Sequence, residues 1–407
     1  MQIPGTYRLD DSDYITIPVM KKFCFENDLR VTGNRMDFIQ QIEEFANRNQ
    51  DNEAKVILWL EEVLKMGIKT CIITKINPIN NTQTDNDIEE KINAAFPSFK
   101  QKNIINCQPE KETKLYKYEL EKDENGDVVR ASFYYIISLV KVINNYSDTG
   151  KTISYPVYID IDLKNGFCIS RAKSSSGLFK VGQEQNKIET SNATSSEKLM
   201  KFCATKILNV IEWVPEDVQI TKNTFKKVIF KILDSYTKTP RLIQNKIDGV
   251  QEECKIFAED IFRKVGIDLN GKSNKDDVLY DLKIFVEKYI SITYPDKSIF
   301  MEDRKAYPVK FLAQDNEFTK IQEHTSGDDP LQSKKAFFDS KKVVYTNKKC
   351  DQITLCQERE AKKYYTDKYF TVSLSLVNGS CMVKFMCFVE EGDIEDVLSR
   401  VIQEYVV

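Results

Sequence analysis

The spacing of apolar residues predicts the order of helices and strands along the chain. Apolar positions three or four residues apart predict two short helices within 16–46 and further helices over 52–64, 88–96, 199–214, 224–236, 247–265, 277–292 and 394–405. Alternating or β-branched runs predict strands over 68–76, 114–120 and 128–142, a hairpin around 165–166, and strands over 307–312, 318–322, 343–346, 352–357, 369–377 and 380–389. The sequence therefore predicts an α+β fold with antiparallel sheets.

The same pattern divides the chain into four regions. A helical hairpin over 1–50 is followed by an α+β domain with an antiparallel sheet over 51–190. A polar stretch rich in Ser, Thr and Asn ends that domain. A helical region over 191–300 then precedes an antiparallel β domain with a closing C-terminal helix over 301–407.

Asp160 and Asp162 lie two residues apart and therefore on the same side of their strand. If 165–166 is a two-residue turn, Asp160 lies directly across from Arg171 on the next strand. Paired acids on a strand can hold a divalent metal in nucleases of the PD-(D/E)xK type, which need an acid-x-Lys on the following strand. The next strand, CISRAKS, lacks that motif. A surface cross-strand ion pair is the better explanation, and no metal site is predicted.

The hairpin at 378–379 has the same kind of turn, and a two-residue register pairs Leu374 with Val383 on an apolar face. Both Asn-Gly turns are followed by one residue and then a cysteine, Cys168 or Cys381, and each hairpin precedes a helix. This repetition suggests a duplicated β-meander with a helix. A common hairpin turn that arose twice explains it nearly as well.

Composition narrows the functional classes. The 407 residues are 41% hydrophobic and 30% charged, with a formal net charge of −3, so a nucleic-acid site would have to be a local patch. Ten cysteines are scattered singly, which is typical of reduced thiols rather than disulfides or zinc knuckles. The single histidine excludes multi-histidine metal centres, and the sequence contains neither a Gly-rich phosphate loop nor a Gly-x-Ser-x-Gly elbow. We therefore expect no cofactor and a protein that is not an enzyme.

The sequence shows no sign of a membrane segment. Its apolar runs are shorter than the roughly 18 residues of a spanning helix. Its N-terminus, MQIPGTYRLDD, has neither the basic start nor the apolar core of a signal peptide. We expect a cytoplasmic protein without membrane contact.

Two lysine-rich segments are candidate surfaces for binding a polyanion. One spans 221–246, with seven basic residues and one acid, and the other spans 333–349, with six lysines and one acid. Lysines opposite the apolar face of a helix can contact phosphates, although such a face is often only solvated. The predicted contact residues are Lys222, Lys226, Lys227 and Lys231 in the first segment and Lys334, Lys335, Lys341 and Lys342 in the second.

The N-terminal hairpin supplies a third candidate surface. An apolar link precedes Gly33, Asn34 and Arg35, and further apolar positions mark a second helix. This pattern resembles the SAP family of small helix-turn-helix DNA-binding modules, in which an apolar-x-x-Gly-x-Lys/Arg turn precedes a helix with an apolar-x-x-Ile/Leu pattern. The resemblance covers about thirty of the 407 residues. The matching residues are Leu29, Val31, Gly33, Arg35, Phe38, Ile39 and Ile42.

The SAP resemblance implies contact between duplex phosphates and the start of the second helix. Free amides and the helix dipole favour an anion there, Gly33 allows close approach, and Arg35 adds charge from an exposed polar face. The predicted contact residues of this turn are Gly33, Asn34 and Arg35. The region 1–50 holds six basic and eight acidic side chains, fewer positive charges than most nucleic-acid binders carry. The alternative is a hairpin that caps the next domain or docks on a protein partner.

The functional hypothesis from sequence is a non-enzymatic nucleic-acid-binding component of a bacterial genome-maintenance or phage-defence assembly. Abundant Lys, Ile and Asn suggest an AT-rich genome, and we expect double-stranded DNA as the partner, with weak sequence preference. A protein partner in a multi-subunit complex is also expected. Two alternatives stay open, namely a protein-interaction scaffold and a divergent metal-dependent nuclease that uses Asp160 and Asp162. The sequence leaves open DNA versus RNA and the oligomeric state.

Overall fold

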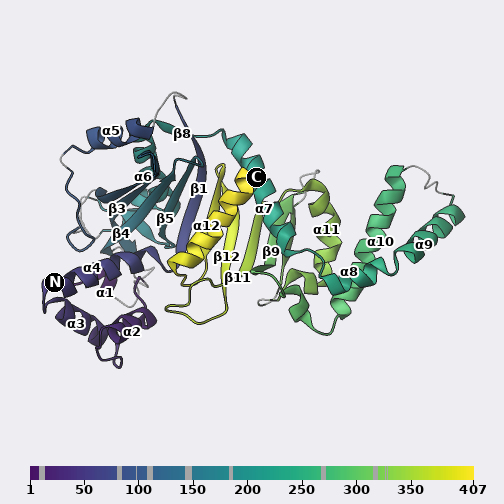
Figure 1. Ribbon diagram of the computed structural model, residues 1–407, viewed down its shortest axis with the longest axis horizontal. Coiled ribbons are helices and arrows are strands. Elements are labelled where there is room, and N and C mark those ends of the chain that lie inside the picture. The colour runs from purple at the N-terminus through teal and green to yellow at the C-terminus, as the bar shows by residue number, and fades with distance from the viewer. Residues whose placement is uncertain are drawn as a thin grey trace.

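The computed structural model describes residues 1–8, 14–79, 85–97, 99–107, 113–142, 149–182, 187–266, 272–314, 320–325, 327 and 329–407. Within these residues the chain forms an α+β fold, in which helices pack on one thirteen-stranded antiparallel sheet (Figure 1). The strands are β1 (Lys69–Pro78), β2 (Lys114–Lys122), β3 (Val128–Val142), β4 (Gly150–Asp162), β5 (Phe167–Lys173), β6 (Leu178–Lys180), β7 (Ala193–Thr194), β8 (Trp213–Pro215), β9 (Ala306–Gln314), β10 (Lys320–His324), β11 (Gln352–Glu358), β12 (Tyr369–Val377) and β13 (Ser380–Phe385). The predicted fold class is confirmed.

The helices alternate with groups of strands along the chain. They are α1 (Gly5–Arg8), α2 (Ile17–Glu26), α3 (Arg35–Ala46), α4 (Gln50–Lys65), α5 (Asp85–Ala95), α6 (Ser196–Ile211), α7 (Val218–Tyr236), α8 (Arg241–Asp248), α9 (Gln251–Lys264), α10 (Lys272–Thr293), α11 (Lys335–Asn347) and α12 (Glu391–Val406).

The sheet is organised around β1, which lies between its two halves. The strand order is β10-β9-β11-β12-β13-β1-β5-β4-β3-β6-β7, with β2 also paired to β3 and β8 to β1. The two predicted β regions, 51–190 and 301–407, therefore contribute to one continuous sheet. The division of the chain into four regions stays a prediction.

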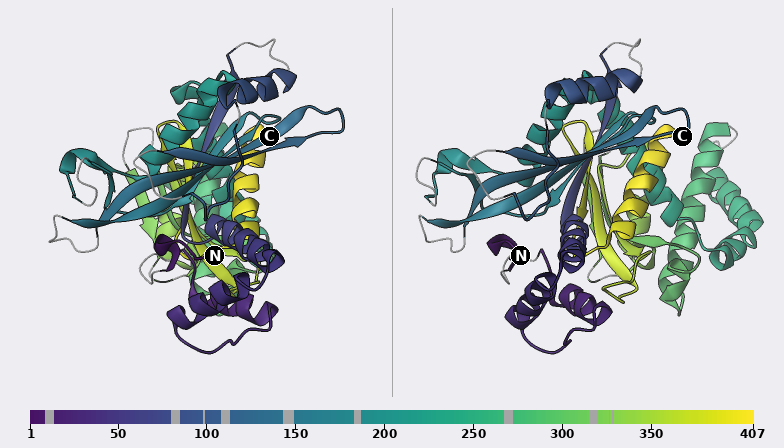
Figure 2. Two further views of the ribbon diagram at one scale, coloured as in Figure 1. Left: turned by 90° about the vertical axis from the view of Figure 1, so that its left-hand side faces the viewer. Right: turned by 60° about the vertical axis from the view of Figure 1, so that its left-hand side comes forward.

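Helices cover the two faces of the sheet unequally. On one face, α1 to α4 lie over the half that contains β2 to β4, while α7, α11 and α12 lie over the half that contains β9 to β13 (Figures 1 and 2). On the opposite face, α5 and α6 cover β3 to β5. Successive side chains of a strand point to opposite faces, so the odd-numbered Cys71 and Ile73 of β1 lie in the core beneath α7 and α12, whereas Ile76 lies in the core beneath α6.

The two Asn-Gly hairpins occupy equivalent places in the sheet. β5 pairs with one side of β1 and β13 with the other, both antiparallel. The helices that follow the hairpins, α6 and α12, cover opposite faces. A two-fold rotation about β1 would therefore exchange β3-β4-β5-α6 with β11-β12-β13-α12. This is the arrangement that an internal duplication would produce, and the duplication stays a hypothesis.

The register predicted for the hairpin at 378–379 is confirmed. Leu374 pairs with Val383, and Val377 pairs with Ser380, so the turn has two residues. Asn378 and Gly379 have φ of 47° and 79°, the left-handed values of the turn that suits a hairpin. An added Cβ at Gly379 would lie 2.9 Å from the Thr221 hydroxyl of α7, so this turn also needs glycine for its close approach to the helix.

The register predicted for the first hairpin is wrong by two residues. Asp162 pairs with Phe167, which leaves a four-residue turn, and Arg171 lies across from Tyr158 rather than Asp160. The Asp162 carboxylate accepts hydrogen bonds from the Asn165 amide at 2.9 Å and from its side chain at 2.8 Å, and these bonds close the longer turn. A shift of two keeps each side chain on its predicted face.

Two predicted elements differ from the structure. The β-branched stretch 343–346 lies inside helix α11, because its buried positions, Phe337, Phe338, Lys341 and Val344, follow helical spacing from the segment before it. The helix predicted over 247–265 is two helices, α8 and α9, which meet at Gly249. Part of the strand predicted at 318–322 falls outside the described residues, and β10 begins at Lys320.

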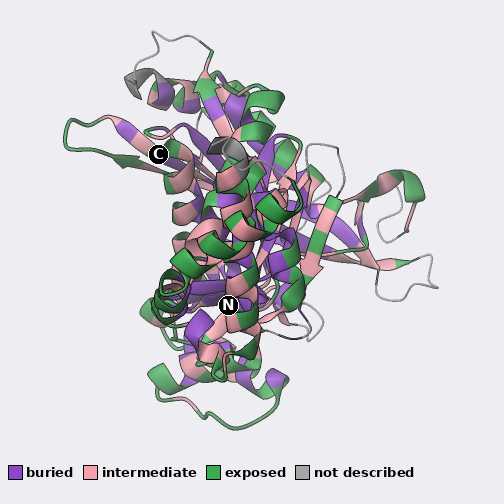
Figure 3. Cartoon of the chain, turned by 90° about the vertical axis from the view of Figure 1, so that its right-hand side faces the viewer, coloured by how far each residue is buried: buried purple, intermediate pink, exposed green. Residues whose placement is uncertain are grey.

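Helices α8 to α10 form an arm that projects from the end of the molecule farthest from α1 to α3 (Figure 1). Few of its side chains are enclosed, and Ala258 is the one buried residue of α9. Viewed from this end, the arm is mainly exposed or half-buried (Figure 3).

Candidate nucleic-acid interface

Arg35 does not lie on an exposed polar face as expected. It is the first residue of α3, yet its side chain is 7% exposed. Its guanidinium donates hydrogen bonds to the carbonyl oxygens of Arg8 at 2.7 Å, Ile15 at 2.7 Å and Tyr7 at 3.2 Å. The planar fork of donors thus ties the start of α3 to the end of α1 and to Ile15, which precedes α2, and the charge is directed inward. The prediction that Arg35 is exposed is wrong.

The start of α3 is capped by its own side chains. Asn34 Oδ1 accepts from the amides of Met36 at 2.9 Å and Asp37 at 3.2 Å, while Asp37 Oδ2 accepts from the Asn34 amide at 2.7 Å. This capping box satisfies the amides that the SAP resemblance assigns to a phosphate, and it adds a carboxylate there. Gly33 and Asn34 are exposed, but the amides of Asn34, Met36 and Asp37 are already engaged, and the Arg35 cation that would favour an anion is directed inward.

Helix α7 matches its predicted phase. Phe225, Ile229 and Ile232 are buried in the core, and Lys227 and Lys231 are exposed on the other side. Lys231 Nζ donates to the carbonyl oxygen of Glu404 in α12 at 3.3 Å, and its ammonium forms no ion pair with a carboxylate of the described residues. The predicted exposure of this face is confirmed.

Lys222 and Lys226 extend the α7 surface toward the end of α11. Lys222 is exposed, and Lys226 is half-buried with its ammonium 2.8 Å from Asp351 Oδ1. Lys349 Nζ lies 3.5 Å from Asn223 Oδ1, and Cys350 donates its amide to the Lys226 carbonyl at 3.0 Å. These bonds hold the loop after α11 beside α7.

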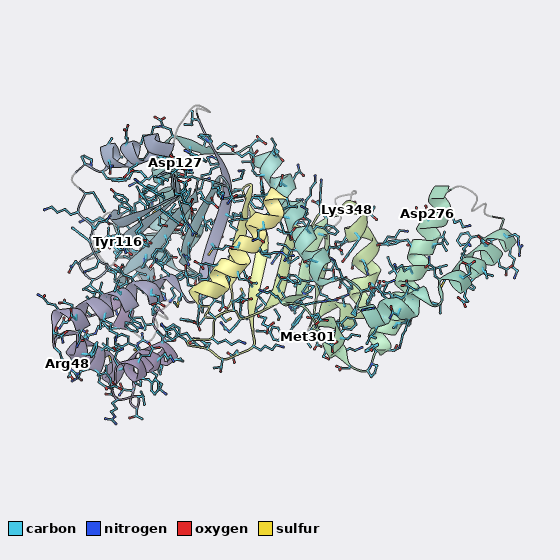
Figure 4. All side chains as sticks on the ribbon, in the orientation of Figure 1. Arg48, Tyr116, Asp127, Asp276, Met301 and Lys348 are labelled. Atoms are coloured by element: carbon cyan, nitrogen blue, oxygen red, sulfur yellow. The ribbon has the colours of Figure 1, made fainter. Side chains whose placement is uncertain are left out.

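Lys348 and Lys349 therefore belong to the same basic surface as the α7 lysines. Lys348 is exposed, adopts a left-handed conformation with φ of 50° at the end of α11, and is labelled in Figure 4. Neither residue was predicted as a contact, because their place beside α7 depends on tertiary structure; the lysine run was the one available signal. We call Lys222, Lys226, Lys227, Lys231, Lys348 and Lys349 the α7 basic surface.

The lysines predicted in the second segment are mostly engaged in ion pairs. Lys341 is buried, and its ammonium lies 2.6 Å from Glu287 Oε2 of α10. Lys342 pairs with Asp281 of α10 at 2.7 Å. These contacts, together with the Lys288–Asp339 pair, join α11 to the arm. Lys341 cannot reach a ligand, and its predicted contact role is corrected.

The start of α11 contributes little further charge. Lys334 pairs with Asp329 at 2.6 Å, and Lys335 is exposed. The α7 basic surface lies far along the molecule from the N-terminal hairpin, as the positions of Lys348 and Arg48 in Figure 4 show. The structure brings the predicted α7 lysines together but does not bring Gly33, Asn34 and Arg35 to them.

The acids proposed for a nuclease are engaged in the fold. Asp160 accepts a hydrogen bond from the Ser132 hydroxyl at 2.6 Å and lies 3.8 Å from Arg171, which also pairs with Glu391 of α12 at 2.6 Å. Arg171 is 6% exposed, so the predicted ion pair exists but is buried rather than on the surface. Among the described residues, no group of three or more His, Cys, Asp or Glu side chains is arranged to hold a metal ion.

Burial beside Arg171 perturbs a neighbouring amine. Lys69 is 1% exposed and donates to the Leu64 carbonyl at 2.6 Å. Burial, together with the positive charges of Arg171 and Lys173, lowers the pKa of Lys69 to about 7. The lowered pKa is a property of the packed sheet face under the N-terminal helices, because Lys69 is enclosed there.

Comparison with family models, with curated proteins and with solved structures finds no significant match to this chain. In the described part of the chain, no helix is long and apolar enough to cross a membrane.

Proposed function

We propose that this chain binds nucleic acid, without catalysis, through the α7 basic surface. Lys222, Lys227 and Lys231 are exposed on one rigid helix, and Lys348 and Lys349 lie beside it. The observation that carries the proposal is that, among the described residues, Lys222, Lys227 and Lys231 form no ion pair with a carboxylate, while Lys226 pairs with Asp351. Such a surface attracts phosphates despite the net charge of −3.

The residue types point to backbone contacts rather than base recognition. An ammonium group is a point charge that binds phosphate from many directions, and the α7 basic surface contains no arginine to pair with a guanine edge. We therefore expect weak sequence preference and double-stranded DNA as the first partner to test. Membership of a genome-maintenance or phage-defence assembly remains a hypothesis, and no contact in the structure tests it.

The first experiment measures binding to labelled duplex DNA of about 25 base pairs over a series of salt concentrations. Counterion release predicts that log affinity falls linearly with log salt, by about 0.9 for each phosphate contact. A single-stranded DNA and an RNA duplex of equal length separate the nucleic-acid classes. Lack of binding to all three at low salt would refute the proposal.

A protein-interaction scaffold is the second candidate. It is favoured by apolar side chains exposed around the turn between α2 and α3, where Phe25 is 68%, Met36 54% and Val31 40% exposed. An exposed apolar cluster beside a capped helix start suits a protein surface better than a phosphate. We do not propose the nuclease, because the carboxylates of Asp160 and Asp162 are engaged by Ser132, Arg171 and Asn165.

A further inference from the structure

A line of apolar side chains runs along α9, beside the side that packs on α10. Their spacing of four, three, four and four residues is the spacing that keeps side chains on one side of a helix and forms the seam of paired helices. Most are well exposed, Val265 at 63%, Phe257 at 56%, Ile261 at 40% and Val250 at 38%. We call Val250, Cys254, Phe257, Ile261 and Val265 the α9 seam.

Among the described residues, α10 covers this seam only in part. Helix α9 packs against α10 through the side that contains Ala258, and Val250 and Cys254 of the seam line a cleft of about 210 Å³ between the two helices, whereas Phe257 and Ile261 do not line it and stay exposed. Figure 3 shows the arm with exposed and half-buried residues toward the viewer. Helices with an uncovered apolar seam in a soluble protein are typical of interaction surfaces.

The charges at the two ends of α9 complement each other. Glu252 and Glu253 lie in its first turn, and Arg263 and Lys264 lie in its last turn. Including the pairs of Glu252 with Lys255 and of Asp260 with Arg263 and Lys264, one end carries a net charge of about −1 and the other about +1. A helix of this kind is complementary to a copy of itself that runs in the opposite direction.

We propose that a second copy of this chain docks on α9, with the two α9 helices antiparallel about a two-fold axis near Phe257. In that arrangement Val250 lies opposite Val265 of the partner subunit, and Cys254 lies opposite Ile261 of the partner subunit. Glu253 then lies near Lys264 of the partner subunit. A two-fold contact uses the same patch on both copies, which self-complementary charges and a continuous seam allow.

The contact is small, so we expect a weak and reversible dimer. Interfaces that bury less than roughly 1,200 Å² are typically transient, and a single pair of short helices buries less than this area. The proposal goes beyond nucleic-acid binding and does not depend on it, because the arm is separate from the α7 basic surface. If both hold, a dimer would present two basic surfaces to one nucleic acid and gain avidity.

Sedimentation velocity of the full chain without nucleic acid tests the dimer, from about 1 μM to about 1 mM protein with reductant present. The wild-type mass should rise toward twice the monomer mass, and Phe257→Glu should remain a monomer. Ile256→Glu is the matched control, since Ile256 is 60% exposed but lies on the other side of α9. Ile256→Glu should associate like the wild type.

A charge exchange tests the orientation of the two helices. Glu253→Lys and Lys264→Glu should each weaken self-association, and an equimolar mixture of the two variants should restore it, because each Lys then meets a Glu. A wild-type chain that stays monomeric at about 1 mM would overturn the proposal, as would equal association of Phe257→Glu and Ile256→Glu. If mixing the two variants does not restore association, the antiparallel arrangement is overturned. Lys222→Ala/Lys227→Ala/Lys231→Ala should dimerise normally, which separates this result from the nucleic-acid proposal.

Discussion

Truncation of Arg35 should destabilise the folded protein, although this residue resembles a phosphate-binding arginine in the sequence. Arg35 is 7% exposed, and its guanidinium donates to the carbonyl oxygens of Tyr7 and Arg8 at the end of α1 and of Ile15 before α2. Hydrogen bonds to a charged group contribute about 1.5–3 kcal/mol each, and their loss leaves the carbonyls without this donor. Because water can reach part of the loosened segment, we expect Arg35→Ala to lower the free energy of unfolding by about 3–5 kcal/mol rather than by the full sum.

Urea unfolding followed by circular dichroism measures this loss. Arg35→Lys should lose about half as much stability, since one ammonium cannot span three carbonyls in the fixed geometry of a guanidinium. Arg30→Ala is the matched control, because Arg30 is exposed and its Nε bonds the Thr32 hydroxyl at 2.8 Å. The control should change stability by less than about 0.5 kcal/mol. A similarly small change for Arg35→Ala would refute the structural role of the buried guanidinium. A smaller slope of log affinity against log salt for DNA binding by that variant would support a phosphate contact by Arg35 instead.

Three further substitutions test other parts of the fold. Gly379→Ala should lower the free energy of unfolding in urea by about 2–3 kcal/mol, because the added Cβ combines a close contact with α7 and the strain of positive φ. Gly126→Ala is the control, with φ of +89° and no atom within 4 Å of the added Cβ, and it should cost about 1 kcal/mol. Equal losses in the two variants would contradict the contact with α7. Lys341→Met should lose about 3–5 kcal/mol by leaving Glu287 buried and unpaired, and adding Glu287→Leu should recover much of it, which a double-mutant cycle measures. Between about pH 7 and 10, Lys69 is neutral in the folded state but still charged in the unfolded state, so the free energy of unfolding should rise with pH. Unfolding curves of Lys69→Met should show a slope that is smaller by up to about 1.4 kcal/mol per pH unit. An unchanged slope would contradict the lowered pKa of Lys69.

Turn propensities and apolar periodicity correctly predicted the elements whose geometry depends on residues close together in the sequence. The register at 378–379 followed from an Asn-Gly pair in left-handed conformation, and the phase of α7 followed from its apolar positions. The first hairpin differs because Asp162 bonds both donors of Asn165 and so stabilises a longer turn. The 343–346 stretch has β-branched residues, but packing of α11 against α10 outweighs their intrinsic preference.

The candidate site depends on contacts between residues far apart in the sequence, which composition cannot reveal. Arg35 bonds carbonyls 20 to 28 residues away, and Lys341 pairs with an acid 54 residues before it. The union of two β regions into one sheet depends on pairing of β1 with β13, more than 300 residues apart. A lysine run was therefore a correct signal of local charge but a poor guide to which lysines remain free for a ligand.

The salt dependence of DNA binding by Lys222→Ala/Lys227→Ala/Lys231→Ala tests the central claim most directly. Its matched control is Lys198→Ala/Lys201→Ala/Lys206→Ala, which removes the same charge from exposed positions of α6 on the opposite face of the sheet. If each α7 lysine contacts one phosphate, the α7 variant should reduce the slope of log affinity against log salt by about 2–3, while the α6 variant keeps the wild-type slope. Equal slopes for the wild type and the α7 variant, or equal reductions in the two variants, would contradict a nucleic-acid site on α7.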